Sequence, residues 1–395
     1  MSRFLLVVPP LVGHINPLAG VATELTRRGH QVAWCGHSER LRDLVGEGAE
    51  VYECAMPDGG DLVRPPGLTG PAAFRFLWEE FFLPLAGAMA PGVEAAVRSF
   101  APDAVLTDQH ALAGSLVSER LGVPYLTSAS TSAELIDPLA ELPKVAAWLT
   151  GRLTELRARV GDPRATADPR FSPYGILAFT SRELLGEGEL PWERVHLVGP
   201  VIADRPEDPE FPWEELDPDR DLVFVSLGTA NTDAGLRFLR ETAKALALLG
   251  DRVQGVFADP GGLLTEAPPG TLVRPHVPQL DLLSRAKAVV SHSGHNTVCE
   301  TLWHGLPLVL APIRDDQPIV ARQVVEAGAG VRVRFGRVDA ARLAEALRTV
   351  LDDTGGHRSR AAEIGRSLRA TGGQRAAADH LEQLTARHPA PFAAH

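Results

Sequence analysis

The chain has 395 residues, of which 45% are hydrophobic and 23% are charged, and its formal net charge is -11. These proportions are typical of a globular protein with large buried cores, and the length predicts two domains. The negative charge argues against a dedicated nucleic-acid binder, which usually carries a basic face. Three widely spaced cysteines, Cys35, Cys54 and Cys299, fit neither a disulfide framework nor a metal site.

The hydrophobic segments are all short. No run of about 18 apolar residues is present, so we expect no transmembrane helix. The N-terminal run FLLVVPPLVG is too short and too lightly charged for a signal peptide. From these observations the sequence predicts a soluble protein of the cytoplasm.

Strands and helices alternate through the first half of the chain. Short apolar runs typical of buried strands occur at residues 4–8, 31–35, 104–107 and 124–128, and helical patterns occur at residues 17–28 and 112–121. A loop with Pro9, Pro10 and Gly13 separates the first strand from the first helix. Such alternation predicts parallel strands with helices on both faces of the sheet.

The same alternation restarts after residue 200. Residues 199–220 are rich in proline and acidic groups, which predicts an extended linker. Strands are then expected at 222–225, 253–257, 288–291 and 308–311, with a helix at 233–249. The predicted fold class is α/β, with two doubly wound domains facing across a cleft and ligands at the carboxyl ends of the strands. We place the domains at 1–200 and 221–375, the linker at 201–220, and a tail at 376–395 that packs on either domain, with a return to the N-terminal one as one option.

Residues 288–301 have the pattern of a phosphate site. A strand is followed by a tight turn containing Gly294, and then by a helix that begins at Asn296 or Thr297. This geometry offers free backbone N–H groups to a phosphate. Ordinary helix capping is the alternative explanation of these polar residues, but it does not account for His292 and Glu300 in the same stretch.

This stretch resembles the signature of the UDP-glycosyltransferase superfamily. The plant form of the signature has a Trp, then Pro-Gln two residues later, then His-Cys-Gly-Trp-Asn-Ser, a Glu three residues on, and finally Asp-Gln. The matching residues here are Pro278, Gln279, His292, Gly294, Asn296, Thr297 (in place of Ser), Glu300, Asp316 and Gln317. The resemblance extends to the N-terminal GHINP and spans most of the chain. It implies the family's GT-B fold, with two Rossmann-like domains.

The resemblance also implies a nucleotide-sugar donor that is held mainly by the C-terminal domain. It places His292, Asn296 and Thr297 at the diphosphate and Glu300 at the ribose. The residues we expect to bind the donor are Ser226, Gly228, Thr229, His276, Val277, Gln279, His292, Ser293, Gly294, Asn296, Thr297, Glu300, Asp316 and Gln317, the last two at the sugar hydroxyls. His276 stands at the family's base-stacking Trp position, and its smaller ring leaves uracil and thymine both open. For the loop at 226–229, a plain strand-to-helix turn is the alternative.

His14 is the candidate catalytic base. It follows the first predicted strand, and an imidazole suits proton removal from an acceptor near neutral pH. A lone histidine is more often structural, but the GHINP context resembles the family's catalytic histidine loop. By the same resemblance, Asp108 is the carboxylate that holds His14 and stabilises its protonated form.

The acceptor is expected to bind mainly to the N-terminal domain. Large apolar residues crowd residues 74–85, and the spacing of Phe74, Leu77, Trp78 and Phe81 is also that of a core-facing helix. Phe82, like Phe76, would lie on the wrong side of such a helix, which favours an apolar wall for a lipophilic acceptor. The acceptor-binding prediction comprises Phe74, Trp78, Phe81, Phe82, His110, Leu135 and Ile136.

The resemblance therefore predicts an inverting glycosyltransferase. It would move a sugar from a UDP- or dTDP-sugar to a hydroxyl of a small lipophilic natural product, with no metal or other cofactor. Two DxD matches at residues 217–221 lie in the linker and are interpreted as solvated charges. The expected partners are the nucleotide sugar and the acceptor, without nucleic acid, and a homodimer is left open. The alternatives are a nucleotide-sugar epimerase and a non-catalytic sugar-nucleotide-binding auxiliary protein.

Overall fold

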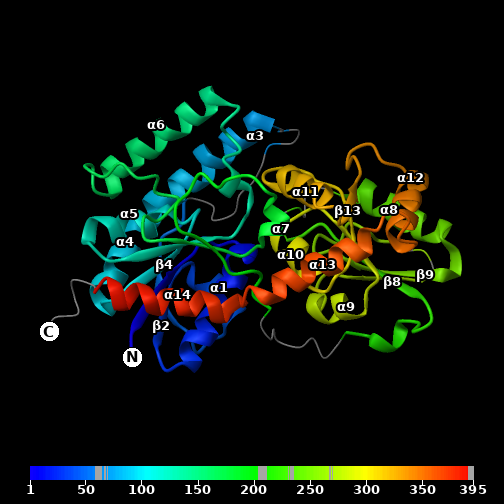
Figure 1. Cartoon of the computed structure of the whole chain (residues 1–395), viewed down its shortest axis with the longest axis horizontal. Helices are drawn as coiled ribbons and strands as arrows, with labels where there is room; N and C mark the ends of the chain where they lie inside the picture. The colour runs from blue at the N-terminus through cyan, green and yellow to red at the C-terminus, as the bar shows by residue number, and fades with distance from the viewer. Residues whose placement is uncertain are drawn as a thin grey trace. The chain divides into compact units, whose positions relative to one another are not determined.

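The computed structural model describes all residues except 58–64, 66–67, 69, 203–210, 230, 232–234, 267, 269 and 390–395. Its contacts separate into two compact units (Figure 1). Unit 1 comprises Met1–Phe179, Gly188–Ala203 and Thr371–His395, and unit 2 comprises Thr180–Glu187 and Asp204–Ala370. Part of the linker expected at 201–220 lies outside the described residues.

Unit 1 is built on a parallel sheet of seven strands in the order β3-β2-β1-β4-β5-β6-β7. The strands are β1 (Arg3–Val7), β2 (Gln31–Gly36), β3 (Glu50–Glu53), β4 (Ala104–Asp108), β5 (Tyr125–Ala129), β6 (Ile176–Ala178) and β7 (Val195–Leu197). The helical segments are α1 (Val12–Arg27), α2 (Ser38–Val45), α3 (Gly70–Leu77), the π-helix η1 (Trp78–Phe82), α4 (Leu83–Phe100), α5 (Leu112–Leu121), the 3-10 turn η2 (Ala133–Ile136), α6 (Pro143–Val160) and α14 (Gly373–Arg387).

The central strand β1 is buried on both faces, as its unbroken apolar run predicts. Leu5 and Val7 belong to an apolar cluster with α4, α5 and α6. Phe4 and Leu6 belong to a second cluster with α1 and α14. Successive side chains of a strand point to opposite faces, so one pentapeptide supplies both layers of the core.

Unit 2 contains a parallel sheet of six strands in the order β10-β9-β8-β11-β12-β13. The strands are β8 (Asp221–Ser226), β9 (Val253–Ala258), β10 (Thr271–Arg274), β11 (Ala288–Ser291), β12 (Leu308–Leu310) and β13 (Gly330–Arg332). The helical segments are α7 (Arg182–Leu185), η3 (Trp213–Glu215), α8 (Leu236–Leu248), η4 (Gly250–Arg252), α9 (Gln279–Arg285), α10 (His295–Trp303), α11 (Gln317–Glu326), α12 (Ala340–Leu351) and α13 (His357–Ala370).

Two segments depart from the boundaries expected at 200 and 375. Residues 180–187 belong to unit 2, where Leu184 of α7 is buried in an apolar cluster with α10, α11 and α13. Helix α14 belongs to unit 1, where Leu381 and Leu384 join the cluster under α1. The packing of the tail on unit 1 is one of the two options left open above, although unit 1 resumes at Thr371 and not at residue 376. In both segments a few buried apolar side chains decide the unit.

The N-terminus of α1 also differs from the prediction. The helix begins at Val12, so Gly13 and His14 lie in its first turn and Pro17 lies inside it. The helical pattern in the sequence had placed Pro17 at the start of the helix, where a proline is tolerated best.

Among the described residues, no helix combines the length and the apolar character needed to cross a bilayer.

The docking of α14 gives a stability prediction. Leu381 is fully buried, and we expect Leu381→Ala to lower the free energy of unfolding of unit 1 by about 2–5 kcal/mol through lost burial and a cavity. Urea unfolding followed by circular dichroism measures this loss. The matched control is Leu248→Ala in α8, where 58% of the side chain is exposed and the loss should stay small. Equal losses in the two variants would show that α14 contributes nothing to the core.

Candidate functional site

Three polar residues of unit 1 lie together at the carboxyl ends of neighbouring strands. His14 lies in the first turn of α1 after β1, Asp108 ends β4, and Ser130 directly follows β5. β1 pairs with β4 and β4 pairs with β5, all parallel, so the three strand ends share one edge of the sheet. Strands β2 and β3 lie on one side of β1, and strands β4 to β7 lie on the other side. Open α/β sheets bind their ligands at such a switch in strand order.

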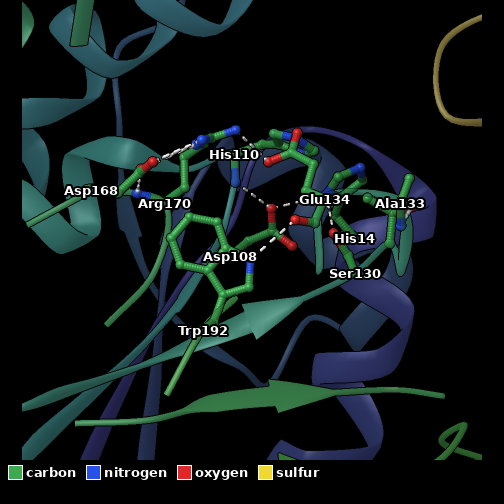
Figure 2. Close-up of polar contacts among 10 residues, drawn as sticks. His14, Asp108, His110, Ser130, Ala133, Glu134, Asp168, Arg170 and Trp192 are labelled. Atoms are coloured by element: carbon green, nitrogen blue, oxygen red, sulfur yellow. Dashed lines mark hydrogen bonds and ion pairs between the residues drawn. The ribbon is translucent and has the colours of Figure 1, made fainter. Parts of the chain in front are cut away.

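Hydrogen bonds fix the orientation of the His14 ring (Figure 2). Nδ1 of His14 lies 2.9 Å from Oδ1 of Asp108 and 2.8 Å from Oγ of Ser130. An ionised carboxylate only accepts hydrogen bonds, so Nδ1 carries the proton and Nε2 keeps its lone pair. The His14 side chain is 18% exposed and that of Asp108 is fully buried. The arrangement therefore presents an accessible proton acceptor that is backed by a buried carboxylate.

The Asp108 carboxyl group stays ionised despite its burial. Burial alone would raise its pKa, but the charge and hydrogen bond of His14, followed by those of His110, outweigh burial and lower the pKa below its usual value. The backbone N–H of His110 donates to Oδ1 at 2.9 Å. An ionised partner is what a protonated His14 needs for stabilisation.

The large apolar residues predicted to contact an acceptor are mostly buried. Trp78, Phe81 and Phe82 belong to the core cluster of unit 1, and Phe74 packs against it. Leu135 is fully buried in η2 and Ile136 is partly buried. His110 is 7% exposed, and its ring stacks on that of Phe82. The structure thus places Trp78, Phe81 and Phe82 in the apolar core and His110 beside His14. Contact of the seven residues with an acceptor stays a prediction.

The expectation that Phe82 lies on the wrong side for a core is wrong. Phe82 is only 3% exposed and lies in the same core cluster as Trp78 and Phe81. Trp78 and Phe82 are four residues apart, so they share one face of a helix. Residues Trp78–Phe82 form a π-helix in the structure.

In unit 2, the candidate donor residues gather after β8 and β11. These two strands pair in parallel at the centre of the sheet, again where the chain changes direction. Helix α10 starts at His295, and its N-cap Gly294 offers no side chain to the first N–H groups. A helix start of this kind binds anions through those groups and its dipole.

His292 is held in a narrow slot between two glycines. A Cβ atom at Gly228 would lie 2.6 Å from Cε1 of His292, and one at Gly294 would lie 2.4 Å from Nε2. Burial, together with the nearby positive charge of Arg314, lowers the pKa of His292 to about 4. The imidazole is therefore neutral near pH 7 and keeps one N–H donor. Both glycines are required because only a glycine leaves room for the ring.

Three further predicted donor residues form hydrogen bonds within unit 2. Nε2 of Gln279, at the start of α9, donates to Oε2 of Glu300, which is buried in α10. Oε1 of Gln317 accepts the backbone N–H groups of Ile313 at 2.9 Å and Arg314 at 3.1 Å, and so closes the loop before α11. Asp316 is the N-cap residue of the same helix. The first contact joins the start of α9 to α10, and the second fixes the loop that leads into α11.

The remaining predicted donor residues differ in their surroundings. His276 and Thr229 are exposed, whereas Val277 packs against the apolar cluster below α9. Ser226 is buried at the end of β8, and its hydroxyl accepts the N–H of Gly228. Ser293 is buried with a φ of 73°, a left-handed conformation that non-glycine residues rarely adopt. Backbone strain of this kind clusters at functional sites.

Sequence reasoning missed two residues of these sites. Ser130 follows a strand next to β4, so the rule that ligands lie at strand ends could have found it. Arg314 donates from Nε to Oδ1 of Asn231 at 2.8 Å and adds a positive charge near His292. It stands two residues before Asp316 of the matched Asp-Gln pair, so its closeness to that motif could have marked it.

Comparisons with known proteins bear on both units. Residues 201–358 match the model of the family described as UDP-glucoronosyl and UDP-glucosyl transferase. The chain is 29% identical to 4'-demethylrebeccamycin synthase of Lentzea aerocolonigenes, over 89% of this chain and 92% of that protein. It is 28% identical to the uncharacterized UDP-glucosyltransferase YojK of Bacillus subtilis, over 96% and 97% of the two chains. A solved structure, the glycotransferase of kitacinnamycin, superposes with a TM-score of 0.80 at 26% identity and covers 97% of this chain and 98% of its own.

The slot around His292 gives a prediction for Gly228. Gly228 has a φ of 73°, and a methyl group there would collide with the buried His292 ring. We expect Gly228→Ala to lower the free energy of unfolding of unit 2, through both backbone strain and the collision. The loss should exceed by about 1–3 kcal/mol the loss in a variant that suffers backbone strain without a collision. The matched control is Gly262→Ala, because Gly262 has a φ of 61° and no atom within 4 Å of the added carbon. Urea unfolding of the two variants measures the difference, and equal losses would contradict the collision.

Proposed function

We propose that this chain, a glycosyltransferase of the UDP-glycosyltransferase superfamily with the GT-B fold, transfers a sugar from a nucleoside diphosphate to a hydroxyl group of a small lipophilic natural product. The family, the fold class and the enzyme class predicted from the sequence are confirmed by the relatives described above. The rebeccamycin and kitacinnamycin relatives support a natural product as acceptor.

The observation that carries the proposal is the bond between Nδ1 of His14 and Oδ1 of Asp108. It leaves Nε2 of His14 free to take the proton of an acceptor hydroxyl, while Asp108 and Ser130 hold the ring. The acceptor oxygen forms a bond to the anomeric carbon, and the bond from that carbon to the diphosphate breaks. The proton goes to His14 and the electron pair leaves with the diphosphate. Attack opposite the leaving group inverts the anomeric configuration.

Unit 2 supplies the groups for the leaving diphosphate in this proposal. The N–H groups at the start of α10 and the neutral His292 are donors aimed at a developing negative charge. Thr297, in the first turn of α10, adds a hydroxyl. Glu300, which accepts a hydrogen bond from Gln279, is the candidate for the ribose hydroxyls, and His276 for the base. Both UDP- and dTDP-sugars fit these groups.

The proposed reaction uses no metal ion. One group of described residues, His14, Asp108 and His110, has ligand atoms within 4.8 Å of one another and could in principle hold a cation. Each of the three side chains already forms a hydrogen bond: Nδ1 of His14 with Asp108 and Ser130, and Nε2 of His110 with Glu134. A hydrogen-bonded proton-transfer group explains the cluster without a metal.

The first test of this function is the base. We expect His14→Ala to lower kcat by roughly 10²- to 10⁴-fold, because a general base contributes that much to proton transfer. Asp108→Asn should also lower kcat, because it removes the charge that stabilises protonated His14. Transfer is assayed by mass spectrometry with panels of UDP- and dTDP-sugars and phenolic, polyketide and terpenoid acceptors, in the presence of EDTA.

The control for this experiment is His388→Ala, which removes an exposed histidine of unit 1 and should leave kcat unchanged. Wild-type turnover by His14→Ala would contradict the proposed role of His14. A change of the donor sugar in the absence of any acceptor would favour the epimerase instead. Nucleotide-sugar binding without any turnover would favour the auxiliary protein.

The second test concerns the diphosphate. We expect UDP or dTDP to raise the melting temperature in proportion to the logarithm of its excess over Kd, and the monophosphates to act much more weakly. Thr297→Val should weaken diphosphate binding by roughly 10- to 100-fold, since a hydrogen bond to a charged group contributes about 1.5–3 kcal/mol. Thr349→Val removes a hydroxyl from α12 and is the matched control. Equal affinity of both variants for the diphosphate would contradict the assignment of Thr297.

A further inference from the structure

A second histidine–carboxylate pair lies beside the first in unit 1. Nε2 of His110 is 2.9 Å from Oε1 of Glu134, and the rings of His110 and His14 are 5.3 Å apart (Figure 2). Glu134 accepts this bond from the ring, because its ionised carboxylate has no proton to donate. The ring of His110 is thus fixed in orientation by Glu134, as the ring of His14 is fixed by Asp108.

Glu134 is itself held firmly. Arg170 donates from Nη1 to Oε2 of Glu134 at 3.1 Å and pairs with Asp168 through Nη2 at 2.7 Å. The indole N–H of Trp192 donates to the backbone oxygen of Glu134. Burial alone would raise the pKa of Glu134, but the charges of His110 and Arg170 and their hydrogen bonds outweigh burial and lower the pKa to about 2. Glu134 is therefore a fixed anion at any working pH.

His110 also holds Asp108. Its backbone N–H donates to Oδ1 of Asp108, the same oxygen that accepts from His14. Within the described part of the chain, the buried Oδ2 of Asp108 has no hydrogen-bond partner. The position of the Asp108 carboxylate thus depends on His14 and on the backbone of His110. A displacement of His110 would move Asp108 and, through it, His14.

The other side of the His110 ring contacts the aromatic segment Trp78–Phe82. The ring of Phe82 stacks on it with centroids 4.3 Å apart and planes 5° from parallel. Trp78 meets it edge-on at 6.1 Å. Both aromatic residues lie in the π-helix η1, and such insertions are frequent at functional sites. His110 therefore connects the candidate acceptor wall to the candidate base.

We propose that His110, fixed by Glu134, is a positioning residue that keeps Asp108 and His14 aligned for proton transfer and couples this alignment to the segment Trp78–Phe82. The proposal rests on the proposed function, because proton removal by His14 is the step that it supports. It assigns to Glu134 a part in turnover and not only in folding.

The alternative is that Glu134 and Arg170 form an ion pair that stabilises the fold and has no part in turnover. Removing one partner of any buried pair destabilises a protein, so a loss of stability alone does not separate the two explanations. A positioning role acts on the chemical step, and it should lower kcat while the KM of the acceptor changes little. A misplacement of about 1 Å can lower turnover by about 10²-fold.

Three variants separate the hydrogen bond from the ring stack. In Glu134→Gln the negative charge is lost. In His110→Phe the ring stack on Phe82 is kept, but Glu134 loses the hydrogen bond from residue 110. In His110→Gln the side-chain amide can still donate to Glu134 while the stack is lost. We expect kcat to fall by roughly 10- to 100-fold in Glu134→Gln and His110→Phe, and to stay within about fivefold of wild type in His110→Gln.

The control variant is Glu119→Gln, which removes another shielded carboxylate of unit 1. Glu119 pairs with Arg157 at 3.2 Å, and its side chain is 18% exposed against 12% for Glu134. Its kcat should equal that of the wild type. Wild-type kcat in Glu134→Gln would overturn the proposal. So would an active His110→Phe together with an impaired His110→Gln, since the stack alone would then matter.

A measurement without turnover separates this proposal from the proposed function. In protein labelled with ¹⁵N-histidine, NMR reports which ring nitrogen of His14 carries the proton. We expect Nδ1–H in the wild type and in Glu119→Gln, and a mixture of tautomers in Glu134→Gln and His110→Phe. An unchanged His14 tautomer in the last two variants would overturn the positioning role even if transfer is observed. The expected tautomers in a protein that transfers no sugar would overturn the proposed function alone.

Discussion

Parallel pairing of adjacent strands decides where the polar residues of both units can meet. Because β1 pairs with β4 and β8 pairs with β11, the carboxyl ends of each pair lie at one edge of their sheet. Asp108 ends β4 and faces the start of α1, and the turn after β11 lies next to the turn after β8. In each unit, the strands that come before this switch in the chain lie on one side of the pair, and the later strands lie on the other side. The helices that follow the two paired strands therefore diverge and leave the strand ends open. Residues that are 94 positions apart, such as His14 and Asp108, therefore come within hydrogen-bond distance.

The two carboxylates of unit 1 show how buried charge is kept at such a place. Desolvation disfavours an ionised acid, and an unpaired buried charge is strongly destabilising. Asp108 and Glu134 each accept hydrogen bonds from a histidine, and Glu134 is also paired with Arg170. For both acids these contacts outweigh burial and lower the pKa. The anions that orient the histidines are thus themselves kept ionised by the histidines.

Much of this arrangement could be predicted from the sequence, because it depends on local patterns. Apolar runs gave eight of the thirteen strands in the described part of the chain to within one or two residues, and the ranges of β11 and α5 agree with the structure at both ends. The short strands β3, β6, β7, β10 and β13 were not predicted. The motif residues gave the positions of His14, His292 and Glu300, since each follows a strand at a fixed spacing. The fold class followed from the alternation of strands and helices.

What the sequence did not predict depends on contacts between distant segments. Ser130 and Glu134 follow β5 and contact His14 and His110, and Arg170 contacts Glu134 from a segment 36 residues further on. No motif marked any of the three. The π-helix at Trp78–Phe82 has no marker in the sequence either. The packing of α14 on unit 1 was one of the two options left open for the tail, and choosing between them required knowing which apolar surface Leu381 covers. Local patterns therefore gave the candidate residues of the site, and tertiary packing gave the contacts that hold them in place.

In the proposed reaction, the candidate donor residues of unit 2 meet a different electrostatic requirement. A leaving diphosphate gains negative charge during the reaction, and a fixed cation would also bind the unreacted donor tightly. His292 is neutral because burial lowers its pKa to about 4, so its contribution is an oriented N–H dipole and not a charge. The first N–H groups of α10 act in the same way. Dipoles that are already oriented need little reorganisation as charge develops, which favours the transition state over the bound donor. The glycines at 228 and 294 are part of this device, because any side chain there would push the His292 ring out of its slot.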